Sequence, residues 1–291
     1  GRSMSRIGWV KEIWRYTVKG MAGEMLTSSG IDGDGLTGDR KWAVRETARS
    51  EIQSCKRHPS LLMCTARYNE HPQRETVGHV RIRLPDGNVV HSDSADVHAR
   101  LAQLTGVDVT LEPLRPASDI DFYRRYNAGG DQWLKDLVAT FTREPGEPLP
   151  DLRQMPPEMI EFVTGAPGSF HLVSPLHLIT TASIRQLRTW NGDSDWNARR
   201  FRPNLVIETE PGLEGLVEQQ WIGKRLSVAD TALDCIDTTL RCGAITRSQE
   251  GLRFDKSILR TVVRQADQNV GVYCRIPAAG TVNVGDAVML A

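Results

Sequence analysis

The sequence predicts a mostly β protein with helices (α+β), in which β-barrels carry a few helices on their outside. Many short segments alternate apolar and polar residues, as half-buried strands do, and turn residues separate them. Only a few segments show the helical spacing of apolar residues. The chain has 291 residues, of which 40% are hydrophobic, so it is long enough for one large domain or two ordinary ones.

Alternation predicts strands in the first third of the chain at residues 9–16, 41–45, 80–84 and 89–90. The last two flank the turn sequence Pro85-Asp86-Gly87-Asn88, which predicts a hairpin. Residues 95–104 read as a short helix that Gly106 can end. The acidic, glycine-rich residues 32–38 resemble a calcium loop, but Leu36 occupies the place of an oxygen ligand, so we expect a plain turn.

Residues 113–168 hold most of the prolines and the least regular pattern. They contain one convincing helix, at about 131–142, with an apolar stripe on one face. We interpret this region as a crossing between domains or as a covering flap. The expected division is therefore an N-terminal β-barrel domain at 4–112, a connecting helical region at 113–168 and a second β-barrel domain at 169–291.

The last part mixes strands and helices. Strands are expected at residues 176–179, 204–207 and 225–228. Thr181 can cap a helix that Asn191-Gly192 ends, and Asp255 can cap a helix over residues 256–265. Residues 282–290 are expected to close the fold as a hairpin around Gly285-Asp286.

Charge and cysteine content exclude several classes of function. Lys+Arg and Asp+Glu both number 36, so the chain lacks the excess of positive charge expected of a protein that binds nucleic acid or an anionic membrane. No apolar run approaches the roughly 20 residues that cross a bilayer, and no signal peptide is visible. The five scattered cysteines argue against a disulfide framework, and without a Cys-x-x-Cys pair they argue against zinc or iron–sulfur sites. We expect a cytoplasmic monomer.

Cys242 is the most informative residue, since it follows Arg241 in Thr239-Leu240-Arg241-Cys242-Gly243. Taken alone, a free cysteine is more often a small buried hydrophobe than a ligand. Three further motifs surround it in order: Phe201-Arg202-Pro203-Asn204, Asn269-Val270-Gly271-Val272-Tyr273 and Gly280-Thr281-Val282-Asn283-Val284-Gly285-Asp286. This ordered set resembles the MOSC family, named for the C-terminal domain of molybdenum cofactor sulfurases. Relatives that include the mitochondrial amidoxime-reducing component carry a further N-terminal β-barrel.

The resemblance implies a molybdenum–molybdopterin cofactor. Cys242 would be its thiolate ligand and catalytic residue, because molybdenum favours soft sulfur donors. The cofactor's phosphate calls for fixed cations and polar groups. The matching positions imply these cofactor-binding residues: Lys19, Gly20, Arg40, Ser174, Arg202, Asn204, Arg241 and Tyr273. Two departures stand out, since Thr17 and Gly20 occupy places where relatives have proline and serine.

The first functional hypothesis is an oxidoreductase that removes oxygen from N-hydroxylated small molecules. The chain has no ferredoxin cysteines and no Gly-x-Gly-x-x-Gly fingerprint, so electrons would have to come from a separate reductase or carrier protein. The alternative is a carrier of the cofactor, or of a persulfide sulfur on Cys242. That carrier would need an outside sulfur donor, because the chain is too short to include the pyridoxal-phosphate desulfurase domain of full sulfurases. A specialised biosynthetic enzyme on the same fold is a third possibility.

The remaining histidines and cysteines are expected to be structural. His171 and His177 are six residues apart, which suits neither one face of a strand nor one face of a helix, so we interpret them as core groups or supports of the site. Cys64, Cys235 and Cys274 read as buried thiols. Cys55 is the least certain of this group, because the adjacent cations favour a reactive thiolate.

Overall fold

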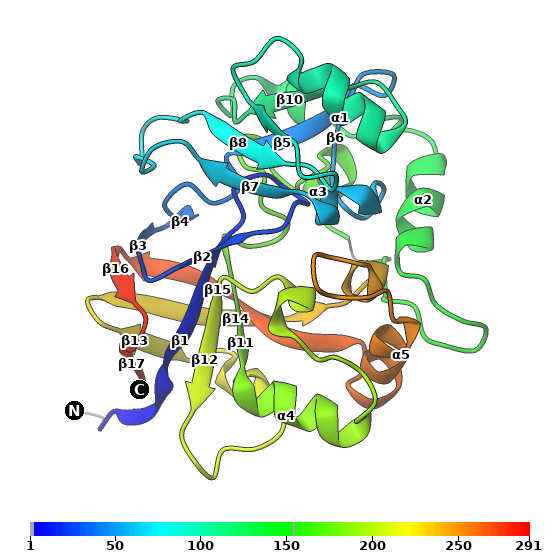
Figure 1. Ribbon diagram of the computed structural model, residues 1–291. Coiled ribbons are helices and arrows are strands. Elements are labelled where there is room, and N and C mark those ends of the chain that lie inside the picture. Colours follow the sequence, from blue (N-terminus) through cyan, green and yellow to red (C-terminus); the bar gives the residue numbers. More distant parts are fainter. Residues whose placement is uncertain (1–2, 154) are drawn as a thin grey trace.

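The computed structural model describes residues 3–153 and 155–291. Its lower half in Figure 1 is a closed seven-stranded β-barrel. The strands are β1 (Ser5–Arg15), β11 (Leu176–Thr180), β12 (Leu205–Thr209), β13 (Arg225–Val228), β14 (Thr231–Leu240), β15 (Asn269–Ala278) and β17 (Ala287–Leu290). They follow the order β12-β11-β15-β14-β13-β17-β1, and β1 closes the ring by pairing antiparallel with β12.

Alternating side chains fill this barrel. In β14, Thr231, Leu233 and Cys235 are buried, whereas the residues between them are partly exposed. Each of the seven strands contributes residues to the apolar cluster inside the barrel, including Val10, Leu178, Ile207, Leu226, Leu233, Val272 and Val288. The short strand β2 (Glu24–Leu26) extends the sheet from β1.

Three small sheets form the upper half of Figure 1 and its junction with the barrel. Each has three strands. They are β10 (Val109–Pro113) with β5 (Trp42–Glu46) and β6 (Glu51–Gln53), β16 (Gly280–Asn283) with β3 (Ser28–Asp32) and β4 (Gly35–Leu36), and β7 (Thr65–Tyr68) with β8 (Val80–Arg83) and β9 (Val89–His91). The expected α+β fold with helical decoration is confirmed.

Helices cover the outside. They are α1 (Val97–Thr105), α2 (Gln132–Thr140), α3 (Pro157–Glu161), α4 (Thr181–Trp190) and α5 (Lys256–Gln265). Ile184 and Leu187 of α4 share an apolar cluster with Ile258 and Val262 of α5. By contrast, none of the residues Gln132–Thr140 of α2 is fully buried. Figure 1 shows α2 on the flank, between the upper sheets and the barrel.

Most local signals are confirmed. The hairpin β8–β9 forms at the predicted turn, and Gly106 ends α1 with a left-handed φ of 79°. Asp255 caps α5 by accepting a hydrogen bond from the Ser257 amide. One cap is wrong by a residue: Thr180, not Thr181, accepts the Ser183 amide at the start of α4, since Thr180 is the last extended residue.

The predicted hairpin at residues 282–290 is wrong. β16 pairs with β3, whereas β17 pairs with β1 and β13, so the two strands belong to different sheets. The turn between them is held by β1, because Gly285 N donates to Val10 O (2.7 Å) and Val10 N donates to Asp286 O (2.9 Å). A tight turn of this kind can pass a strand from one sheet to another as well as close a hairpin.

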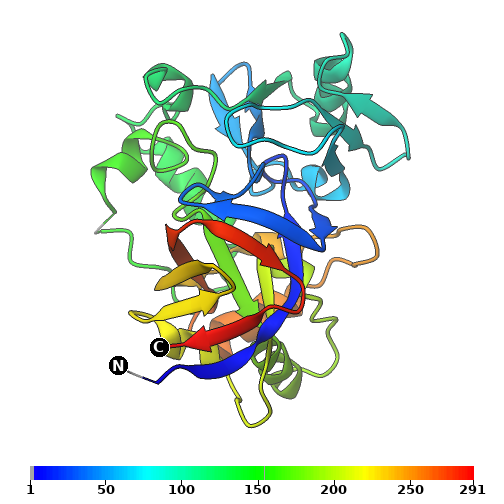
Figure 2. The ribbon, with the colours of Figure 1, turned by 90° about the vertical axis from the view of Figure 1, so that its left-hand side faces the viewer.

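The first strand of the chain therefore lies in the same barrel as the last. Ser5 pairs with Leu290, and Figure 2 shows both ends side by side at the base of the barrel. The division into 4–112, 113–168 and 169–291 stays a prediction. The strand pairing shows that β1, from the first of these ranges, is a strand of the barrel formed by the third. None of the helices described above has the length and apolar character that a bilayer crossing requires.

Candidate functional site

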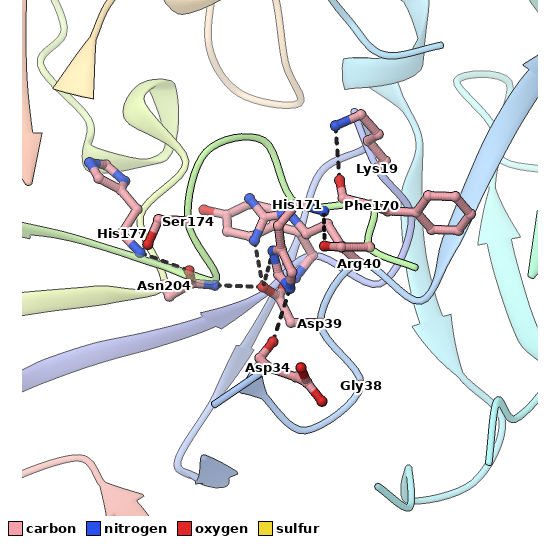
Figure 3. Close-up of polar contacts among 12 residues, drawn as sticks. Lys19, Asp34, Gly38, Asp39, Arg40, Phe170, His171, Ser174, His177 and Asn204 are labelled. Atoms are coloured by element: carbon pink, nitrogen blue, oxygen red, sulfur yellow. Dashed lines mark hydrogen bonds and ion pairs between the residues drawn. The ribbon is translucent and has the colours of Figure 1, made fainter. Parts of the chain in front are cut away.

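A buried carboxylate organises the junction between the barrel and the small sheets (Figure 3). Asp39 is fully buried. Its Oδ1 accepts from Tyr16 N (2.7 Å), and its Oδ2 accepts from Arg40 Nη1 (2.6 Å) and Asn204 Nδ2 (3.1 Å). Asn204 also accepts from His177 N, so it joins Asp39 to the start of β11. Asn204 and Arg40, both expected at the site, thus meet at Asp39.

Tyr16 lies at the centre of a cationic cluster, which we define as Lys19, Arg40 and Arg202. The guanidinium carbons of Arg40 and Arg202 lie 4.4 Å and 4.5 Å from its ring centroid. Its hydroxyl donates to Pro203 O (2.9 Å), which fixes the ring. Burial raises the pKa of Tyr16, so the ring stays neutral beside the two cations.

Arg202 has an unused donor. It follows the 3-10 turn Ala198–Phe201 and adopts a left-handed φ of 55°, which turns its side chain back toward Tyr16. Within residues 3–153 and 155–291, its buried Nη1 has no hydrogen-bond partner. A buried charged donor without a partner is costly, so this atom is suited to an anion from outside the chain.

Lys19 adds a second cation whose charge state is sensitive to ligands. Its Nζ donates to Phe170 O (2.9 Å). Burial, with the like charges of Lys56 and Arg40, lowers the pKa of Lys19 to about 7. A bound anion would reverse that shift and hold the ammonium charged.

The structure shows why glycine occupies position 20 of this chain. Its φ is +82°, and a Cβ there would lie 2.6 Å from Cys55 N. Cys55 in turn is close enough to raise the pKa of both Lys19 and Arg202, against the lowering effect of burial. This places the Cys55 thiol beside the cationic cluster, which the sequence only hinted at through the neighbouring Lys56 and Arg57.

Arg241 is engaged by the protein itself. Its Nε donates to Val270 O (3.0 Å), its Nη1 to Phe201 O (2.9 Å) and its Nη2 to His177 Nε2 (2.8 Å). Burial and the Arg241 charge hold the pKa of His177 well below its usual range, so the imidazole is neutral and Nε2 accepts. Arg241 therefore positions the segment next to Cys242, with few donors left for a ligand.

Ser174 and Tyr273 line the same region. Ser174 Oγ donates to Cys274 O (2.6 Å), which leaves only its lone pairs for a ligand. The Tyr273 ring is half-buried and lies 5.9 Å from the His177 ring. His177 is buried, as expected of a core group or a support of the site.

Cys242 lies under a covering segment. The residue is 9% exposed, and it precedes the 3-10 turn Gly243–Thr246. Residues 141–148, called the strap below, run over it. Arg143 Nη2 donates to Arg241 O (3.1 Å), and a Cβ on Gly243 would lie 2.7 Å from Thr142 Oγ1. The strap thus contacts the residues on both sides of the thiol.

Ion pairs fasten the strap to α5. Glu147 pairs with Arg260 and Arg264, each at 3.1 Å, and Glu144 pairs with Arg264 at 3.0 Å. The Glu147 side chain is only 6% exposed, so its pairs are better shielded from water than ordinary surface pairs. Residues 141–148 are therefore a fastened segment within the region 113–168, which we interpret as a crossing between domains or a covering flap.

Releasing the strap should expose the thiol. We expect Glu147→Gln to speed alkylation of Cys242 by iodoacetamide by roughly 3- to 10-fold, because one neutralised carboxylate weakens two ion pairs and local opening becomes more frequent. Peptide mass spectrometry over time measures the rate. Glu210→Gln removes an exposed pair with Arg6 elsewhere and should leave the rate unchanged. Equal rates in both variants would show that the strap does not limit access.

Protein side chains alone do not form a metal centre here. In the described part of the chain, no group of three or more His, Cys, Asp or Glu side chains could hold a metal ion. All five cysteines are free and buried. A metal at Cys242 would therefore need further donors from a cofactor.

The cationic cluster at the junction of the barrel and the small sheets, with Cys55 beside it, is a candidate binding site for an anionic cofactor. Residues 7–138 match the MOSC N-terminal beta barrel domain, and residues 166–289 match the MOSC domain. Together the two matches span most of the chain, which belongs to the MOSC domain family.

Solved structures of low sequence identity are also similar. The YuaD protein from Bacillus subtilis shares 10% identity at a TM-score of 0.43, with 99% of this chain and 98% of that chain covered. YiiM from Geobacillus stearothermophilus shares 14% identity at a TM-score of 0.31, with 40% of this chain and 54% of that chain covered. None of the curated proteins matches the sequence.

Proposed function

We propose that the protein binds the molybdenum cofactor in the cationic cluster and uses it to reduce N-hydroxylated small molecules. The observation that carries this proposal is the buried, unpartnered Nη1 of Arg202, a statement limited to the residues that the structure describes. The cluster sets two guanidinium groups and Lys19 beside one buried carboxylate, Asp39, so it retains a positive charge that an anionic pterin phosphate can neutralise.

The residues present fit such a group. Arg202 Nη1 and Lys19 Nζ would hold the phosphate, and the tight left-handed backbone at Gly20, next to Lys19, leaves no room for a side chain against Cys55. Cys242 would supply the thiolate ligand, with Tyr273 lining the same side. The bound cofactor would supply the oxygen-accepting, two-electron chemistry that the side chains lack. The chain's own part is to bind the anion, hold the ring of Tyr16 and keep water from the thiol with the strap. Electrons would come from a separate partner protein.

Metal analysis tests the proposal. Protein made in a host that synthesises the cofactor should carry molybdenum, and Cys242→Ser should lose it while its circular dichroism and melting temperature stay near those of the parent. Cys55→Ser is the matched control, since it makes the same change at the thiol beside the cationic cluster and should keep the metal. Metal lost in Cys55→Ser but kept in Cys242→Ser would overturn the ligand assignment. Arg202→Ala should weaken pterin retention by about tenfold or more, in excess of its effect on stability.

Turnover separates the proposal from the carrier alternative. Molybdenum-loaded protein should reduce a simple N-hydroxyamidine with a chemical electron donor. Loaded protein that is inactive in this assay, with an added sulfur on Cys242 detected by mass spectrometry, would support a carrier instead.

A further inference from the structure

Arginines cover the outer face of the small sheet formed by β7, β8 and β9. Burial alternates along these strands, so every second residue packs into the apolar cluster of the upper half. The outward positions of the three described strands are Thr65, Arg67, Arg81, Arg83, Val89 and His91, and none of them is acidic. The outer face of this sheet is therefore positively charged.

Two of these arginines face each other at a cost in stability. Arg67 of β7 and Arg81 of β8 lie directly opposite in the register of the antiparallel pair. Like charges at such positions repel each other and destabilise a sheet. Both residues are exposed and contribute nothing to the apolar cluster. Stability of the fold therefore does not account for the pair, whereas binding of an acidic surface would.

A loop of the barrel continues this positive face. Arg83 Nη2 lies 2.7 Å from Glu250 Oε2, and Glu250 belongs to the loop 247–254, which is orange in Figure 1. Glu250 is the one acidic residue of this loop, where Arg247 and Arg253 add two positive charges. The sheet and the loop together present what we call the arginine face, which consists of Arg67, Arg81, Arg83, Arg247 and Arg253.

The loop is held in place from below. Arg199 Nη2 donates to Glu250 O (2.9 Å), and Nη2 of the buried Arg200 donates to Arg253 O (2.9 Å). Both donors belong to the 3-10 turn Ala198–Phe201, which precedes Arg202 of the cationic cluster. The backbone of the loop is therefore fixed before any partner arrives, which lowers the entropy cost of binding.

This fixed loop carries an exposed aromatic ring. Leu252 is buried, whereas Phe254, two residues later, is 55% exposed. The guanidinium carbon of Arg247 lies 5.9 Å from the centroid of the Phe254 ring. Aromatic residues and arginine are enriched in protein–protein interfaces, so this pair has the composition of an interface centre.

The arginine face lies next to the segment that carries Cys242. The 3-10 turn Gly243–Thr246 follows Cys242 directly, and the loop 247–254 starts from this turn. Asp255 N donates to Thr246 O (2.9 Å), which closes the loop on the same turn. A protein on the arginine face would thus contact a segment that is continuous with Cys242.

We propose that the arginine face docks a protein whose contact surface is rich in Asp and Glu and has an apolar centre for Phe254. Opposite charges accelerate and orient such an encounter, and the aromatic ring adds short-range affinity. Glu250 within the face and the balanced charge of the chain argue against nucleic acid. That the docked protein is the electron carrier rests on the function proposed above, but the docking itself does not.

Two acidic electron carriers, a plant-type ferredoxin and a flavodoxin, are suitable probes, with basic cytochrome c as their counterpart. NMR titration of the isotopically labelled protein should show saturable binding of an acidic carrier, with resonance shifts in β7, β8 and residues 247–254. The affinity should fall about tenfold or more when the salt concentration rises from about 50 to about 300 mM. Equal binding of cytochrome c, or no saturation with either acidic carrier, would overturn the proposal. Tighter binding of a single-stranded DNA oligonucleotide would also overturn it, by assigning the face to nucleic acid.

Variants locate the binding energy. Arg81→Glu should weaken binding by about tenfold or more, and Phe254→Ala by about 3- to 10-fold. Arg275→Glu makes the same charge reversal at an exposed position of β15 and should leave the affinity unchanged. Equal affinities for the parent and Arg81→Glu would contradict docking on this face.

Arg81→Gln distinguishes a binding role from a structural one. Because it removes the repulsion with Arg67, it should raise the urea midpoint while it lowers the affinity for the acidic carrier. A lower urea midpoint with unchanged affinity would make Arg81 a structural residue and refute the proposal.

The docking proposal and the proposed function can fail separately. Salt-sensitive binding of an acidic carrier by a chain that never retains molybdenum would refute the proposed function and leave the docking standing. Molybdenum-loaded protein that reduces an N-hydroxyamidine with a chemical donor, but binds the carriers equally well with Arg81→Glu, would do the reverse.

Discussion

Replacing Gly271 with alanine is expected to destabilise the protein by about 3 kcal/mol, the sum of a backbone cost and a collision. Gly271 has a φ of +84°, and a Cβ there would lie 2.2 Å from His177 Nε2 and 3.1 Å from Leu178 O. The ring cannot retreat, because it is buried and Nε2 accepts from Arg241. The expected result is a lower urea midpoint at an unchanged slope.

Gly212→Ala is the control for this prediction. Gly212 has a φ of +93°, but in the described structure a Cβ there meets no atom within 4 Å. It should therefore show only the cost of the left-handed backbone, about 1–2 kcal/mol. If both variants lost the same stability, the contact with His177 would be irrelevant and the Arg241–His177 pair could shift freely.

The free energy of unfolding of the parent is expected to fall by roughly 3 kcal/mol as the pH rises, because Glu218 ionises in the folded protein. Glu218→Gln is expected to lack this fall. Glu218 is fully buried in the 3-10 turn Val217–Trp221, and its carboxylate accepts from Thr180 N (2.6 Å) and from the Ser183 hydroxyl at the start of α4. Burial raises its pKa from 4.5 to about 7. The folded protein thus binds more protons than the unfolded chain between these values, so its contribution to stability is present below pH 4.5 and is lost as the pH rises to about 7.

The measurement is the difference in unfolding free energy between parent and variant from pH 4.5 to 8. His171 and His177 also titrate differently in the folded protein, with lowered pKa values, but their effect cancels in the difference. Exposed Glu214 lies on the same loop, so Glu214→Gln should follow the parent curve. Parallel curves for parent and Glu218→Gln would show that this carboxyl ionises freely in the folded state.

Elements with strong local signals could be predicted from the sequence. The turn at residues 85–88 fixes its hairpin, and Asp255 starts α5, because caps and turns depend on neighbours a few residues away. The partners of β16 and β17 could not, since Gly285-Asp286 has the same composition whether it closes a hairpin or passes between sheets. Strand pairing at long range is decided by the whole barrel.

The site was predictable only in part for the same reason. The resemblance names Arg40, Arg202 and Asn204, and the fold gathers them around Asp39 and Tyr16. That gathering joins β1 and β12, which pair only in three dimensions. The sequence offered a covering flap as one interpretation of residues 113–168 and left Cys55 open, but loops with no periodic pattern gave no signal for which residues they contact.

The pairing of β1 with β12 and β17 also has a consequence for biosynthesis. A ribosome releases Ser5–Arg15 long before Leu205–Thr209 and Ala287–Leu290, the two strands that flank it in the barrel. Ring closure must therefore await the synthesis of Ala287–Leu290, a connectivity of high contact order that folds slowly. Until then the apolar face of β1 is exposed, and we expect the nascent chain to aggregate unless a chaperone covers that face.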